Sequence, residues 1–103
     1  MLVPLEAPLH GFRLVGELDI SSARDVSEAL TALPGDGDLT LELSELEFID
    51  SSGLHALVQY AGSLNGAGSN LILANPTAMT ERVFDIAGLA EHPRIVIEAT
   101  SGE

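Results

Sequence analysis

The sequence predicts an α/β domain with a mixed, mainly parallel sheet, an N-terminal strand hairpin and three helices. Short apolar segments of two-residue period alternate along the chain with segments of helical period. Glycine, proline, asparagine and aspartate separate these segments. Strands that alternate with helices imply right-handed crossovers between parallel strands. No repeat or linker divides the 103 residues, so we expect a single domain over residues 1–103.

The N-terminal segment predicts an edge strand. Residues 1–8 are mainly apolar but contain Pro4 and Pro8, and proline cannot donate a hydrogen bond within a central ladder. Residues 11–15 predict a second strand, and the short link over residues 8–11 indicates that the two strands pair as a hairpin closed by Gly16.

The first helix follows this hairpin. Asp19, Ser21 and Ser22 are candidate N-caps, and Pro34 with Gly35 ends the helix. Its apolar side chains recur every three or four residues and predict one buried face: Ala23, Val26, Ala29, Leu30 and Leu33.

A strand and a second helix come next. After a turn at residues 36–38, residues 39–43 alternate between apolar and polar, and Phe48 with Ile49 continues the same apolar segment to its end. From Ser51 to residues 65–66 the period is helical, with a face made of Leu54, Leu57, Val58, Ala61 and Leu64.

The C-terminal third predicts a strand, a helix and a strand. Residues 71–74 form the first strand, and Pro76 opens the helix at its first position. Gly88 followed by Leu89 is typical of a left-handed helix end, and residues 94–98 form the last strand. The helix has a predicted buried stripe of Met79, Val83, Phe84 and Ala87, with an outer edge that could join a partner interface.

The composition limits the partners. The net charge is −12, so we expect no nucleic acid partner and no binding to an anionic membrane. Cysteine is absent and the three histidines are far apart, so we expect no disulfide, metal or cofactor. No apolar run approaches the ~18 residues that span a bilayer and no signal peptide is recognisable, which favours a cytoplasmic protein without membrane insertion.

Two acidic loops, residues 16–19 and 50–53, are expected at the carboxyl ends of strands, where α/β sheets place their functional crevice. Ser51 would stand at a helix start, where free N–H groups and the helix dipole stabilise a phosphoryl group. Asp50 or Ser51 could also simply cap the helix, and the role of a cap is compatible with that of a phosphate acceptor. Gly53 would admit another protein's backbone or a nucleotide, or serve close packing.

The same residues argue against an enzyme. A hydrolase elbow needs glycine two residues before the serine, where Ile49 stands. Ser51 and His55 share a helix face but lack an orienting acid and an oxyanion hole. A receiver domain and a P-loop both use a lysine, and this chain has none. The glycine-rich residues 66–70 therefore predict a turn.

The chain resembles the STAS family, named for sulphate transporters and anti-sigma factor antagonists, and is most similar to the free-standing bacterial antagonists. The resemblance rests on residues 16–19, on Leu43 and Leu46 followed by residues 48–54, and on residues 82–89. It implies that a partner anti-sigma factor, itself an ATP-dependent serine kinase, phosphorylates Ser51. The unphosphorylated antagonist would bind that kinase and free a sigma factor, and a partner serine phosphatase would restore binding.

By the same resemblance the partner-facing surface would contain Asp19, Asp50, Ser51, Ser52, Gly53 and Leu54. Family members commonly have a further helix after the last strand, whereas this chain stops shortly after Glu98. We expect either a less covered sheet face or its cover by a partner or a second copy in a homodimer. An alternative function is that of a STAS subunit or scaffold in a transport or stress-signalling complex without serine phosphorylation.

Overall fold

The computed structural model describes residues 2–6, 10–32, 37–64 and 69–98. The predicted hairpin link at residues 8–9, the helix stop at 34–35, the start of the turn at 36, the turn at 66–68 and the tail from 99 onward lie outside these residues. The described strands are β1 (Leu2–Pro4), β2 (Gly11–Leu14), β3 (Gly16–Leu18), β4 (Leu39–Glu42), β5 (Leu46–Ile49), β6 (Leu71–Ala74) and β7 (Ile95–Glu98). The helices are α1 (Ile20–Thr31), α2 (Ser51–Ser63), α3 (Ala78–Ala87) and a short 3-10 turn, Leu89–Glu91.

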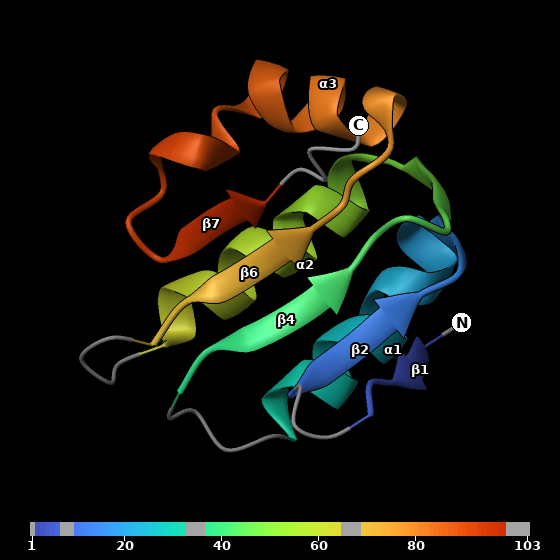
Figure 1. Ribbon diagram of the computed structural model, residues 1–103. Helices are drawn as coiled ribbons and strands as arrows, with labels where there is room; N and C mark the ends of the chain where they lie inside the picture. Colours follow the sequence, from blue (N-terminus) through green and yellow to red (C-terminus); the bar gives the residue numbers. More distant parts are fainter. Residues whose placement is uncertain (1, 7–9, 33–36, 65–68, 99–103) are drawn as a thin grey trace.

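The main sheet has five strands in the order β1-β2-β4-β6-β7. β1 pairs antiparallel with β2, and the remaining neighbours pair in parallel. The predicted hairpin and the mainly parallel sheet are therefore confirmed. In Figure 1, α1 and α2 lie side by side behind this sheet, and α3 lies above β6.

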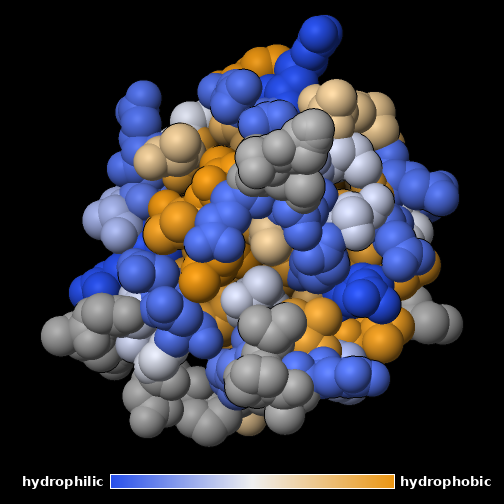
Figure 2. All heavy atoms as spheres, viewed as in Figure 1, coloured by the Kyte–Doolittle hydropathy of each residue, from blue (hydrophilic) through white to orange (hydrophobic). Residues whose placement is uncertain are grey.

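The core lies between the sheet and the helices because β4 and β6 turn their leucines to the same face. Leu41 and Leu73 are neighbours in the register of β4 and β6, and both are fully buried. Phe84 from α3 is also fully buried, as expected from the sequence. The face turned toward the viewer in Figure 2 shows apolar and polar atoms interleaved. Val96 on β7 is 39% exposed.

A second, two-stranded sheet was not foreseen. The expected loop at residues 16–19 contains β3, which pairs in parallel with β5. Phe48 and Ile49 do not continue β4; they belong to β5, and Phe48 is 44% exposed. The prediction of one strand from residue 39 to 49 is therefore wrong.

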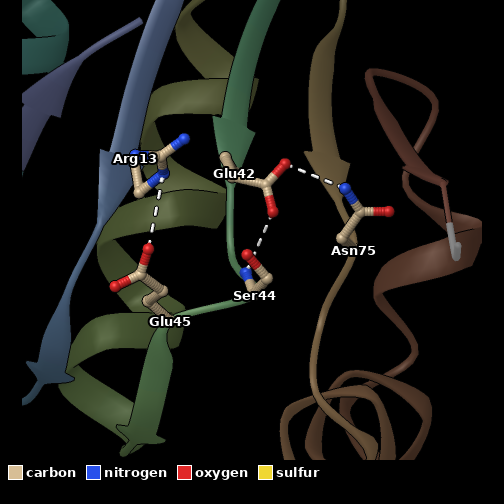
Figure 3. Close-up of polar contacts among 5 residues, drawn as sticks. All are labelled: Arg13, Glu42, Ser44, Glu45 and Asn75. Atoms are coloured by element: carbon tan, nitrogen blue, oxygen red, sulfur yellow. Dashed lines mark hydrogen bonds and ion pairs between the residues drawn. The ribbon is translucent and has the colours of Figure 1, made fainter.

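Polar contacts explain where β4 ends (Figure 3). The Glu42 carboxylate accepts from the Ser44 backbone N–H at 3.2 Å and from the Asn75 side-chain amide at 2.9 Å. The next residue, Glu45, lies 3.8 Å from the Arg13 guanidinium. The Leu43 carbonyl then accepts from the Leu46 N–H at 3.1 Å and closes a turn, so the segment leaves the main sheet and begins again as β5.

The third helix differs from its predicted pattern. It begins at Ala78, not at the expected first position Pro76, and its N-cap is Thr77. The Thr77 hydroxyl also donates to the Thr80 hydroxyl at 3.0 Å. This contact satisfies a polar group in the interior, so Thr80 is fully buried. Met79 is 53% exposed and Ala87 is also exposed, contrary to the expected stripe. Gly88 has φ +73° and precedes buried Leu89, which confirms the predicted left-handed end.

Candidate functional site

The small β3–β5 sheet places two helix starts side by side. Leu18 is the register partner of Ile49, and the Leu18 carbonyl accepts a hydrogen bond from the Asp50 N–H at 3.2 Å. Asp19 and Asp50 follow directly and begin α1 and α2. The two acidic turns therefore meet at one edge, as expected, but at the end of the small sheet rather than of the main one.

Asp19 holds the start of α1 in a closed set of hydrogen bonds. Its Oδ1 accepts from the Ser21 hydroxyl at 2.7 Å and from the N–H groups of Ser21 and Ser22 at 3.0 and 3.2 Å. The Ser22 hydroxyl accepts from the Asp19 N–H at 2.9 Å and donates to the Glu17 carbonyl at the same distance. Both serines of this turn therefore have their hydroxyls engaged.

The Ser21 hydroxyl is the largest cause of a lowered pKa at Asp19. A depressed pKa in the folded state adds stability above the ordinary value of 3.8, and this stability is lost as the pH falls through the folded-state pKa. We expect Asp19→Asn, which keeps an oxygen acceptor, to be less stable than wild type near neutral pH. The difference in unfolding midpoint should close in acid. Thermal unfolding between pH 2.5 and 7 measures it, and a constant difference would exclude this linkage.

Asp50 caps α2 in a simpler way. Its Oδ1 accepts from the Gly53 N–H at 3.0 Å, and its carbonyl accepts from the Leu54 N–H at 2.9 Å. Ser51 is exposed, and no described residue forms a hydrogen bond with its hydroxyl. The cap role thus belongs to Asp50, which leaves the Ser51 hydroxyl open to a reagent or partner.

Gly53 serves close packing within the chain. A Cβ at this position would lie 2.5 Å from the Leu18 carbonyl oxygen and 2.7 Å from its Cγ. Gly53 is buried, so the structure shows the packing role and gives no opening for a foreign backbone or nucleotide. Ser52 and Leu54 are partly buried, and Leu54 packs against the core.

A groove of about 560 Å³ runs between α1 and α2 from this edge. Ser51, Ser52 and His55 line it from α2, and Ile20 and Arg24 line it from α1. Ile20 is 77% exposed, an unusual position for a large apolar side chain. Sequence reasoning missed this groove. One feature of the sequence could have indicated it: the apolar residue Ile20 stands directly after the N-cap of α1 and lies outside the buried face of that helix.

The arrangement does not bring together the parts of a catalytic site. His55 is exposed in the same groove as Ser51, and no described acid forms a hydrogen bond or ion pair with it. His92 accepts at Nδ1 from the Arg94 N–H at 3.1 Å, far along the chain. No group of three metal-binding side chains occurs among the described residues. None of the described helices is both long and apolar enough to cross a bilayer.

Comparison with known proteins identifies related sequences. The STAS domain model matches residues 8–103. The anti-sigma-B factor antagonist of Bacillus subtilis strain 168 is 34% identical over 79 residues, which cover 76% of this chain and 72% of that protein. An antagonist is a regulatory protein rather than an enzyme.

Two solved structures extend the comparison. An anti-sigma factor antagonist from Mycobacterium paratuberculosis has a TM-score of 0.75 at 23% identity, and the match covers 98% of this chain and 86% of that one. The Bacillus cell fate determinant SpoIIAA in its phosphorylated form has a TM-score of 0.66 at 25% identity, with 98% and 91% covered. The chain therefore belongs to the STAS domain family.

Proposed function

We propose that this protein is an anti-sigma factor antagonist that is switched off by phosphorylation of Ser51. In the unphosphorylated form it binds an anti-sigma factor kinase and so releases a sigma factor. ATP-dependent transfer of a phosphoryl group to the Ser51 hydroxyl ends the interaction, and a serine phosphatase restores it.

The observation that carries this proposal is the contrast between the serines of the two turns. The hydroxyls of Ser21 and Ser22 are held by Asp19 and Glu17, whereas the Ser51 hydroxyl is exposed and no described residue binds it. A kinase can reach the Ser51 hydroxyl without first breaking a hydrogen bond to any of the described residues.

The surroundings of Ser51 suit a charge that is added and removed. The first turn of a helix has free N–H groups and a positive dipole end, so a phosphate can be accommodated without unfolding α2. Asp19 and Asp50 lie at the same edge, and Ser52 and Leu54 continue the surface over buried Gly53. A partner that contacts this surface closely would meet the phosphate directly.

The comparisons support the proposed role. The curated relatives are anti-sigma-B factor antagonists, and one of the similar structures is of a phosphorylated protein.

Phosphosite mapping tests the assignment. Incubation with the cognate anti-sigma factor kinase and ATP should add one phosphate, and Ser51→Ala should abolish the incorporation. Ser52→Ala is the matched control, because this neighbouring hydroxyl is partly buried, and it should retain the phosphate. Phosphate on another residue of the wild type, or undiminished incorporation into Ser51→Ala, would contradict the proposal.

A further inference from the structure

Arg24 and His55 are the basic side chains that line the groove containing Ser51. The chain has only four basic residues of the lysine or arginine type, all arginines. Arg13 lies against Glu45, Arg94 donates to the Ser69 carbonyl at 3.3 Å, and Arg82 is on α3. In a protein with a net charge of −12, the placement of one of these four arginines beside the candidate acceptor requires an explanation.

The strand register brings Arg24 opposite the start of α2. Because β3 and β5 are paired in parallel, α1 and α2 begin level with each other at Asp19 and Asp50. Arg24 and His55 each lie five positions after their cap, across the groove from one another and about one helical turn, 5.4 Å, beyond the level of Ser51. Side chains on a helix lean toward its N-terminus, which is the direction of Ser51.

The present partner of Arg24 holds it weakly. Its Nε lies 3.5 Å from Glu28 Oε2, and the two side chains are 86% and 70% exposed. Such exposed ion pairs contribute little to stability, and arginine before glutamate along the helix is the less favourable order. A phosphate has more charge than the carboxylate and matches the planar fork of the guanidinium.

We infer that Arg24 is the phosphate-binding residue of the modified protein, leaving Glu28 and reaching across the α1–α2 groove to the phosphoserine at position 51. This inference rests on the proposed function, which makes Ser51 the acceptor. The other charged groups near the phosphate are Asp19 and Asp50 at the helix starts and Glu28 in the groove, which repel it, and His55, one turn along α2. Arg24 offsets part of this negative charge.

Phosphorus NMR of protein made with phosphoserine at position 51 tests this contact without a kinase or a partner. A guanidinium beside a phosphate lowers its second pKa. We expect the titration midpoint of the phosphate to rise by at least about half a pH unit in Arg24→Gln. Arg82→Gln, which removes an exposed arginine from α3, is the matched control and should leave the midpoint unchanged.

Two further variants separate the contributions. With Arg24→Lys the titration midpoint of the phosphate should lie between those of the wild type and Arg24→Gln, because lysine keeps the positive charge but lacks the planar guanidinium group. Imidazole groups titrate in the same pH range as the phosphate. The measurement is therefore repeated in proteins that also have His55→Gln, and Arg24→Gln should raise the titration midpoint of the phosphate by the same amount there. Equal midpoints in the wild type and Arg24→Gln would overturn the inference while leaving Ser51 as the acceptor. Failure of the kinase to modify Ser51 would overturn the proposed function. The NMR result would still show whether Arg24 binds a phosphate at position 51.

Discussion

Replacing Gly53 with alanine should destabilise the protein, whereas the same substitution at Gly62 on the same helix should stabilise it. The added methyl group at position 53 would be 2.5 Å from the Leu18 carbonyl oxygen and would have to displace backbone. Overpacking of this kind costs about 1–3 kcal/mol. At exposed Gly62 the new Cβ would meet no described atom within 4 Å beyond its chain neighbours and the backbone of its own helix, and alanine in a helix gains up to about 1 kcal/mol over glycine.

Urea or thermal unfolding of both variants measures whether each substitution lowers or raises the free energy of unfolding. For a domain of this size, each kcal/mol changes the unfolding temperature by about 4–8 °C. Because Leu18 immediately precedes Asp19, Gly53→Ala should also weaken partner binding by moving the two helix starts apart. Stabilisation of similar size by both substitutions would show that α2 does not approach β3 as closely as described.

A negative charge at position 51 should have its main effect on the partner complex and little effect on folding. A like charge or an unpaired charge in a close interface costs several kcal/mol, so we expect Ser51→Asp to weaken binding to the anti-sigma factor at least about tenfold. Phosphoserine, with a charge of about −1.5 to −2, should weaken it further. The free energy of unfolding should change by less than about 1 kcal/mol, since an acidic group in the first turn of a helix is favourable.

Gln59→Glu is the matched control for added charge. Gln59 is exposed on α2 and lines the same groove, eight residues after Ser51, or about 12 Å along the helix. That distance exceeds the Debye length of about 8 Å at physiological ionic strength, so the control should bind nearly as well as wild type. Calorimetric titration with the partner compares the three proteins. Equal affinity of wild type and Ser51→Asp would refute the role of charge at this position.

The sequence was sufficient for elements whose pattern is local. β6 was predicted with its observed ends, because apolar residues stand between a glycine-rich turn and Asn75-Pro76. The sequence also predicted the left-handed Gly88 and limited the N-cap of α2 to Asp50 or Ser51, since each depends on residue types next to each other in the chain.

Other features depend on contacts between distant residues. β3 has three residues, too few for a period, and only its partner β5 defines it as a strand. The burial of Thr80 depends on a hydroxyl contact with Thr77 that a hydrophobic pattern does not represent. The packing role of Gly53 depends on Leu18, thirty-five positions earlier, and was one of two alternatives until the structure placed them together.

The pairing of β3 with β5 also affects the thermodynamics of recognition. A binding surface built from loops must lose conformational entropy when a partner orders it, and this loss reduces the affinity. Here the strand pair fixes the backbone on one side of each acidic turn, and the caps by Asp19 and Asp50 fix it on the other. The proposed partner surface is therefore preorganised, and a partner should find it in its binding-competent shape. Its affinity would then be set mainly by desolvation and charge, the two quantities that a single phosphate changes most.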